Sequence, residues 1–167
     1  MSGRADPFEG KLRSLEILMD EVARLKTDGK RIVLANGCFD ILHVGHVRFL
    51  RAAKDHGDFL IVAVNSDASA RRLKGEGRPY VPEKERLELL SCLDPVDRLI
   101  LFDEADVSKL LLALRPHVHA KGTDYTAETV PERDTVRSYG GEVAICGDAK
   151  ERSSTEIGAR LGGTRSP

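Results

Sequence analysis

The sequence has few cysteines and no long apolar run. Its cysteines, Cys38, Cys92 and Cys146, are odd in number and lack the spacing of a disulfide framework, which favours free thiols in a reducing compartment. No stretch approaches the roughly 18 consecutive apolar residues of a membrane helix. The polar segment 1–10 has no apolar centre that could serve as a secretory signal. These absences predict a soluble, cytoplasmic protein with no membrane contact.

The chain also has no excess of charge of one sign. It carries 26 basic and 27 acidic residues, for a formal net charge of −1, and its basic residues are dispersed. Nucleic-acid binding normally requires a basic patch or run, so the sequence gives no support for a nucleic-acid partner. A small anionic ligand held by local charges fits this composition better.

Length and hydrophobic pattern predict one α/β domain. The 167 residues suffice for a single core. We expect a disordered tail over 1–10, one domain over 11–161 and a loose tail over 162–167. Within the domain, apolar residues at helical spacing predict an amphipathic helix over 11–26 that either covers the core or meets a partner subunit.

Apolar runs then alternate with helical patterns. Strands are expected over 32–35, 59–65, 98–102, 118–120 and 142–146. Helices are expected over 44–55, 83–93, 107–114, 132–139 and 155–161. This alternation predicts a Rossmann-like, doubly wound, five-stranded parallel sheet with helices on both faces and an extra N-terminal helix.

Segment 66–82 is the one long stretch that the pattern leaves irregular. It follows the carboxyl end of a strand, where open α/β sheets bind their ligands. Lys74, Gly75, Gly77 and Arg78 lie in it. The competing interpretation is a solvated basic loop, because Lys and Arg are common in loops.

The motif His43-Val44-Gly45-His46 carries the strongest chemical signal. It follows the apolar run 32–35 and the turn-like segment 36–40, so it begins a helix whose free N–H groups favour an anion. Residues three apart are neighbours on a helix, and Gly45 has no side chain to block a phosphate. No serine or cysteine is paired with a histidine and a carboxylate as an activated nucleophile. The motif therefore predicts phosphoryl or nucleotidyl transfer by positioning and charge stabilisation.

Two other interpretations of the motif are open. Cys38, His43 and His46 are potential zinc ligands, although no second Cys/His pair with finger-like spacing follows. Alternatively, the two histidines only cap and solvate a helix.

Segment 36–46, NGCFDILHVGH, resembles the signature of the cytidylyltransferase-like HxGH nucleotidyltransferases. Within that superfamily the chain is similar, from about residue 15 to residue 161, to the bacterial D-glycero-β-D-manno-heptose 1-phosphate adenylyltransferases. These include the transferase half of the bifunctional heptose kinase/adenylyltransferases. Further matching segments occur in the same order at 64–69, 72–79, 121–125 and 153–157.

The resemblance implies transfer of AMP from ATP to D-glycero-β-D-manno-heptose 1-phosphate for lipopolysaccharide or surface glycan synthesis. It implies Mg²⁺ on the triphosphate but no protein metal ligand, a homodimer, and a separate kinase that supplies the sugar phosphate. The cytidylyltransferase branch has an arginine five residues before Ser153, where this chain has Asp148, so ATP is expected rather than CTP. The alternatives are a cytidylyltransferase, an FAD synthetase-like enzyme for another phosphorylated polyol, and a non-catalytic nucleotide-binding regulator.

The resemblance also assigns roles to individual residues. The catalytic residues would be His43, His46 and Lys74. Nucleotide binding would involve Gly37, Cys38, Phe39, Gly45, Asn65, Ser153, Ser154 and Thr155. Substrate binding would involve Asn36, Asp40, Arg78, Lys121 and Asp124. Purely structural alternatives are an N-cap for Asp40 and for 153–155, and a strand-terminal turn for 121–125.

Overall fold

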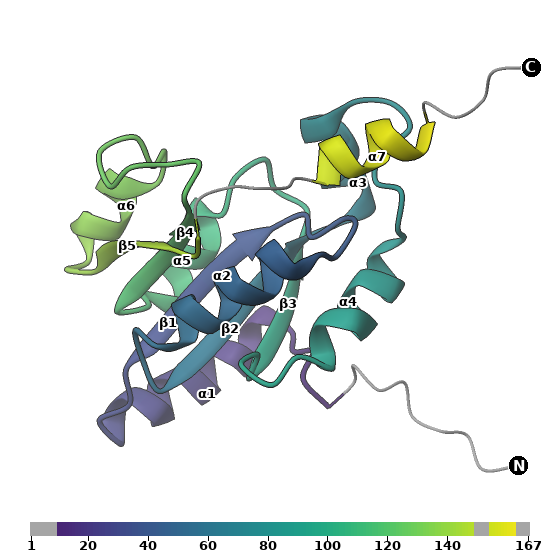
Figure 1. The fold of residues 1–167 in the computed structure, drawn as a ribbon. Helices are drawn as coiled ribbons and strands as arrows, with labels where there is room; N and C mark the ends of the chain where they lie inside the picture. Colours follow the sequence, from purple (N-terminus) through teal and green to yellow (C-terminus); the bar gives the residue numbers. More distant parts are fainter. Residues whose placement is uncertain (1–9, 149–153, 163–167) are drawn as a thin grey trace, which may run out of the picture.

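The computed structural model describes residues 10–148 and 154–162. Segments 1–9 and 163–167, which hold nearly all of the two expected tails, lie outside the described residues. The described chain forms one parallel sheet of five strands in the order β3-β2-β1-β4-β5 (Figure 1). The strands are β1 (Ile32–Gly37), β2 (Phe59–Asn65), β3 (Arg98–Phe102), β4 (Val118–Gly122) and β5 (Glu142–Cys146). The predicted Rossmann-like parallel sheet is confirmed.

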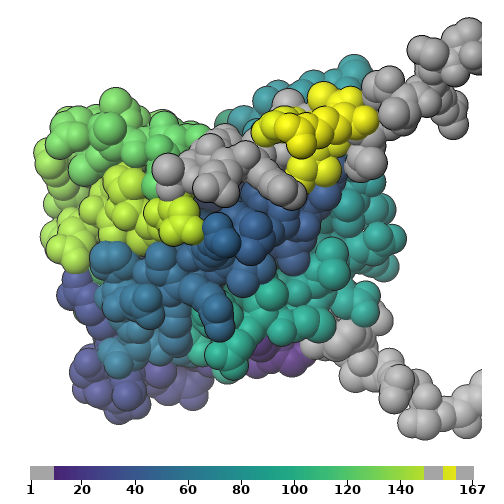
Figure 2. Space-filling model, viewed as in Figure 1, coloured from purple at the N-terminus to yellow at the C-terminus, as the bar shows by residue number. Residues whose placement is uncertain are grey.

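Helices cover both faces of this sheet. Alternate residues of a strand point to opposite faces, so Val33 and Ala35 pack in one core cluster while Ile32 and Leu34 pack in the other. The first cluster is completed by α2 (Val44–Lys54) and α4 (Glu83–Ser91), whose side chains cover the face seen in Figure 2. The second is completed by α1 (Leu15–Thr27), α5 (Ser108–Leu114) and α6 (Arg133–Ser138). Continuous apolar strands are required because both faces are buried.

The N-terminal helix closes the core. Leu18 and Val22 of α1 are buried against the sheet, and Glu21 forms a two-pronged ion pair with Arg98 of β3. The helix begins later than expected, because Leu12 forms an isolated parallel bridge with Leu99. That bridge covers part of the outer edge of β3, which would otherwise expose unpaired backbone groups.

The expectation of an irregular segment over 66–82 is wrong for its first half. Residues Asp67–Lys74 form helix α3. The Ser66 hydroxyl caps it by accepting a hydrogen bond from the Ser69 N–H at 3.0 Å. Gly75, with φ of +94°, ends it in a backbone conformation that favours glycine. Lys74 is therefore held in the last turn of a helix and not on a free loop.

The strand order places a topological switch point between β1 and β4. The chain runs outward from β1 through β2 to β3, and then crosses to the other side for β4 and β5. Crossover connections leave a crevice at such a point, outside the carboxyl ends of the strands. Asn36 at the end of β1 and Lys121 at the end of β4 lie at that crevice.

Candidate active site

A cavity of about 970 Å³ opens at the carboxyl ends of β1, β2, β4 and β5. Most of the predicted site residues line it: Asn36, Gly37, Cys38, Phe39, Asp40, His43, Gly45, His46, Asn65, Lys74, Arg78, Lys121 and Asp124. A smaller cavity of about 510 Å³, between residues 12–15 and the end of β3, contains none of them. The structure thus brings together residues that are up to 88 positions apart, from Asn36 to Asp124.

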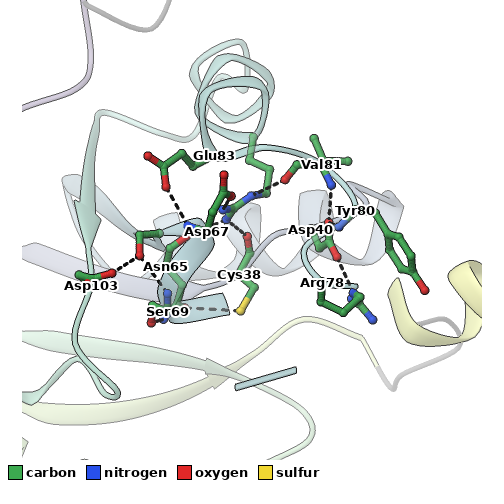
Figure 3. A network of polar contacts seen from close by, with 12 residues as sticks. Cys38, Asp40, Asn65, Asp67, Ser69, Arg78, Tyr80, Val81, Glu83 and Asp103 are labelled. Atoms are coloured by element: carbon green, nitrogen blue, oxygen red, sulfur yellow. Dashed lines mark hydrogen bonds and ion pairs between the residues drawn. The ribbon is translucent and has the colours of Figure 1, made fainter. Parts of the chain in front are cut away.

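The last predicted element is described only in part. Ser153 lies outside the described residues, and at Ser154 and Thr155 only the helical backbone that begins α7 (Ser154–Gly162) is described. Helix α7 packs beside Tyr80, because a Cβ on Gly158 would come within 2.7 Å of the Tyr80 ring (Figure 3). Glycine at position 158 therefore permits this close approach.

The two histidines of the motif stack on each other and cap the start of α2. His43 is the N-cap residue, and its Nδ1 accepts a hydrogen bond from the Gly45 N–H at 3.1 Å. The Nδ1 of His46 accepts from the His43 N–H at 3.3 Å, and the two rings stack with centroids 3.9 Å apart. An Nδ1 that accepts a backbone N–H has no proton of its own, so in each neutral ring the proton is on Nε2. The two histidines therefore do cap the helix, and these hydrogen bonds make each ring an Nε2–H donor.

Gly45 leaves room for this arrangement. A Cβ at position 45 would lie 2.8 Å from Cε1 and 2.9 Å from Nδ1 of the His43 ring. A side chain there would have to displace the imidazole that caps the helix. Glycine between the histidines therefore leaves space for the His43 ring as well as for a ligand.

The turn after β1 has an unusual backbone. Phe39 has a positive φ of 48°, is buried, and contacts the His46 ring with centroids 5.3 Å apart. A Cβ on Gly37 would lie 3.2 Å from the Phe39 ring, so glycine makes room for it. This packing connects the turn to the histidine motif.

Arg86 on α4 holds the turn from inside, and the sequence interpretation did not identify it. The side chain is buried, with 1% of the residue exposed. Its Nη1 donates to the carbonyl oxygens of Cys38 at 2.5 Å and Asn65 at 2.8 Å. Its Nε donates to the Val81 carbonyl at 2.9 Å, and its Nη2 to the Asp67 carboxylate at 2.8 Å. One guanidinium thus joins the ends of β1 and β2 to the start of α3 and to the segment before α4.

Arg86 also fixes the direction of a peptide group at the cavity. The C=O and the following N–H of a trans peptide point in opposite directions. Because the Cys38 carbonyl points toward Arg86, the Phe39 N–H points away from it. Nothing in the pattern of 83–91 marked this arginine, since a charged residue in an amphipathic helix is usually exposed.

Asp40 ties segment 78–81 to the same turn (Figure 3). Its Oδ1 accepts from the N–H groups of Tyr80 at 2.8 Å and Val81 at 2.9 Å, and its Oδ2 pairs with Arg78 Nε at 2.8 Å. The alternative interpretation of Asp40 as an N-cap is wrong, since His43 caps α2. Both carboxylate oxygens of Asp40 are thus occupied within the protein.

Only the Nε of the Arg78 guanidinium is bonded to Asp40, and its Nη2 is available to a ligand. Arg78 lines the cavity and lies over the Tyr80 ring, with Cζ 4.5 Å from the ring centroid. Its Nη2 is buried and has no hydrogen-bond partner among the described residues. A buried N–H group without an acceptor is unfavourable, so this atom is suited to an anionic oxygen of a ligand.

Cys38 lies in the cavity as a thiol. Burial raises the pKa of Cys38, and this effect is opposed by the positive charges of Lys74 and Arg86. A raised pKa keeps the thiol protonated near neutral pH, which excludes a nucleophilic thiolate there. The exposed Lys74 lines the same cavity as this thiol.

Lys121 is already paired on the opposite side of the cavity. Its ammonium is 3.4 Å from Oε2 of the buried Glu132 and 4.7 Å from the centroid of the Tyr125 ring. Neither Glu132 nor Tyr125 was among the predicted site residues, although Tyr125 ends the matching segment 121–125. Their contacts hold the lysine at the cavity wall.

An ion pair crosses the rim between α2 and β5. Arg48 of α2 and Asp148 lie 3.1 Å apart, and both side chains are more than half exposed. Next to them, Gly147 has a φ of +91°, and a Cβ there would lie 3.3 Å from Cα of Phe49. The position expected to separate ATP from CTP use is thus an acidic residue held by an arginine.

Neither a metal centre nor a membrane-spanning helix is found among the described residues. Within 10–148 and 154–162, no group of three or more His, Cys, Asp and Glu residues lies close enough to hold a metal ion. None of the helices in the described part of the chain has the length and apolar character needed to cross a bilayer.

Known proteins resemble this chain in sequence and in fold. A relative from Geobacter sulfurreducens with the name Bifunctional protein HldE is 46% identical over 149 residues, which are 89% of this chain and 30% of the relative. A relative of the same name from Geotalea uraniireducens is 47% identical over 93% of this chain and 32% of its own length. The chain therefore spans about a third of the length of these curated relatives.

Two solved structures share the fold. The crystal structure of the lipopolysaccharide core biosynthesis protein from Thermoplasma volcanium matches with a TM-score of 0.63 and 32% identity, over 73% of this chain and 100% of that one. Pantothenate synthetase from Thermus thermophilus matches with a TM-score of 0.63 at 17% identity, over 84% of this chain and 63% of that one, which shows a common fold only. The family model described as cytidylyltransferase-like matches residues 34–158, most of the chain. The resemblance to the cytidylyltransferase-like nucleotidyltransferases is thereby confirmed, and the chain belongs to the cytidylyltransferase-like family.

Proposed function

We propose that this chain transfers AMP from ATP to D-glycero-β-D-manno-heptose 1-phosphate, forming ADP-heptose and pyrophosphate for lipopolysaccharide or surface glycan synthesis. The observation that carries the proposal is the pair of imidazoles that cap the start of α2. Their Nδ1 atoms accept backbone N–H groups, so each ring is an Nε2–H donor in the cavity that Lys74 also lines. The similarity to proteins named Bifunctional protein HldE and to a lipopolysaccharide core biosynthesis protein supports the choice of sugar.

The reaction joins two anions, so charge neutralisation is the main requirement. An oxygen of the sugar 1-phosphate attacks the α-phosphorus of ATP, and the bond from that phosphorus to the bridging oxygen breaks. The electron pair stays on the departing pyrophosphate. His43 and His46 donate hydrogen bonds that strengthen as this charge develops, and Lys74 places a positive charge between the two reactants.

The remaining predicted residues divide between the two substrates. On the nucleotide side are the backbone of 37–39, Gly45, Asn65 and the element 153–155. On the sugar phosphate side are Asn36, Asp40, Arg78, Lys121 and Asp124. The buried Nη2 of Arg78 supports this division, because its N–H groups lack an acceptor among the described residues. Because the charge of Lys121 is already paired with Glu132, its contact with the sugar phosphate would position the substrate more than neutralise its charge.

Mg²⁺ enters as part of the ATP substrate. Asp40 is the buried carboxylate of the cavity wall, and both of its oxygens already accept hydrogen bonds. The residues present therefore fit an ion held through phosphate oxygens and water, as Mg²⁺ commonly is with nucleotides. The ion neutralises phosphate charge when it is bound.

Pyrophosphate release over four nucleoside triphosphates and a panel of sugar and polyol phosphates tests this function. We expect kcat/KM for ATP to exceed that for CTP by about tenfold or more, since a base that leaves polar groups unpaired is bound poorly. The reasons for this expectation are the match of segment 72–79 to the adenylyltransferase branch and Asp148 in place of the arginine of the cytidylyltransferase branch. Equal or better use of CTP would contradict the adenylyl assignment.

The same panel separates the other candidate activities. Release with glycerol phosphate, choline phosphate or a flavin mononucleotide, but not with the heptose 1-phosphate, would identify a cytidylyltransferase or an FAD synthetase-like enzyme. ATP binding without release for any acceptor would identify a nucleotide-binding regulator. The fixed Nε2–H donors favour the enzyme, because a regulator has no need for groups that stabilise a transition state.

We also propose that the chain acts as a cytoplasmic homodimer and receives its sugar phosphate from a separate kinase. The exposed Ile17 and Met19 on α1 offer an apolar surface, and all three cysteines are free. Light scattering at micromolar concentration is expected to give twice the mass of the 18.4 kDa chain. The mass of a single chain would contradict the dimer, and formation of a sugar 1-phosphate by this chain alone would contradict the separate kinase.

A further inference from the structure

His119 lies in the sheet next to the central strand β1, although no motif points to it. It is on β4, fully buried, and pairs in register with Leu34 of β1. Asn36 follows Leu34 by two residues, so its side chain lies on the same face of the sheet. The His119 Nε2 is 2.9 Å from the Asn36 Oδ1. A buried imidazole thus contacts a residue that lines the cavity.

The hydrogen bonding of this pair decides which atoms carry protons. The Nδ1 of His119 is buried and has no partner among the described residues. If the proton is on Nε2, it is donated to Asn36, and only an acceptor lone pair on Nδ1 goes unused. If the Asn36 amide were reversed, a buried Nδ1–H would lack an acceptor, and orphaned buried N–H groups are rarer than under-used acceptors. The first arrangement is therefore favoured.

The charge state of the ring agrees with this arrangement. Burial lowers the pKa of His119 to about 3, and the nearby charge of Lys121 contributes to the shift. The ring is therefore neutral near pH 7 and carries one proton, which the contact with Asn36 places on Nε2.

We propose that His119 is a positioning residue that holds the Asn36 carboxamide with its oxygen toward the sheet and its NH₂ group toward the cavity. The amide nitrogen of Asn36 has no hydrogen-bond partner in the part of the chain that the structure describes. It is thus a donor of fixed direction for an oxygen of a bound substrate. The catalytic consequence rests on the proposed function, whereas the orientation itself does not.

Ring ¹⁵N chemical shifts of the wild-type protein test the orientation without any turnover. We expect His119 to be the neutral Nε2–H tautomer with no titration between pH 5 and 8. An Nδ1–H tautomer, or a pKa near the ordinary value of about 6.5, would overturn the proposal. A wild-type chain that releases no pyrophosphate would contradict the proposed function and leave this measurement decisive.

A double-mutant cycle tests the consequence for the substrate. His119→Leu removes the donor and keeps an apolar side chain, and we expect kcat/KM for the sugar 1-phosphate to fall about tenfold, the scale of one hydrogen bond. His119→Gln retains an N–H donor and should recover most of this loss. On an Asn36→Ala background, His119→Leu should change kcat/KM less than about twofold, because the group that it positions is already absent.

A histidine that only fills the core gives a different pattern. His119→Leu would then change the melting temperature and reduce kcat/KM equally with and without Asn36, or leave kcat/KM unchanged, and either result would overturn the proposal. If His119→Leu does not fold, His119→Met takes its place in the same cycle as the variant without a donor, and the ring measurement still tests the orientation.

Discussion

His46→Ala is expected to lower kcat by about a hundredfold or more, the scale of losing one donor to a developing negative charge. The KM for ATP should change much less, because the contact of Nε2–H with the leaving phosphate strengthens mainly in the transition state. His43→Ala should behave similarly. The double variant should lose less than the product of the two single effects, since both donors act on one group of atoms. Steady-state kinetics with saturating sugar 1-phosphate measure all three.

The capping bonds of this motif require a matched control. His46→Ala also removes the acceptor for the His43 N–H, so a loss of about 1 kcal/mol of stability is expected in addition. His46→Asn places an amide oxygen near the position of Nδ1 and has no counterpart of Nε2–H. The His46→Asn protein should therefore retain most of the thermal stability, while its kcat falls as far as that of His46→Ala. Wild-type kcat in a folded His46→Ala protein would show that the histidine only stabilises the helix.

Arg86→Met should lower the free energy of unfolding by about 3 kcal/mol or more. The carbonyl oxygens of Cys38 and Asn65 would lose their donor, and each buried group left unsatisfied costs about 1–3 kcal/mol. The Val81 carbonyl and the Asp67 carboxylate lose a partner as well. Such a loss is a large fraction of the stability of an ordinary domain. Urea unfolding at pH 7, followed by circular dichroism, measures it.

Lys84→Met on the same helix is the control for Arg86. Lys84 is exposed, so its replacement should change the free energy of unfolding by no more than about 0.5 kcal/mol. Arg86→Lys keeps the charge but not the planar set of donors, and an intermediate loss is expected. If Arg86→Met and Lys84→Met proved equally stable, the guanidinium would not hold the cavity wall together.

The strands β1, β2 and β4 could be predicted from sequence because they are largely buried on both faces. Runs such as 59–65 contain no charged residue, and a parallel sheet covered by helices requires such runs. Helix α3 was missed because its eight residues include three basic side chains and a short apolar face. Ser66 and Gly75 were the available signals, since a cap residue and a stop glycine flank the segment.

The site was predictable where function depends on local spacing. His43, Gly45 and His46 lie within one turn of helix, so their arrangement follows from the motif. Arg86 and His119 act through partners as far as 48 and 83 positions away, and no local pattern indicates such contacts. Only the folded topology, which brings the ends of β1, β2 and β4 together, identifies them.

The central claim is most directly tested by identifying the products. The purified chain is incubated with ATP, Mg²⁺ and D-glycero-β-D-manno-heptose 1-phosphate, and the products are identified by mass spectrometry and ³¹P spectroscopy. Our account predicts ADP-heptose and pyrophosphate in equal amounts, with both lost in His46→Asn. ATP that stays intact, or that is hydrolysed while the heptose 1-phosphate is unchanged, would contradict it.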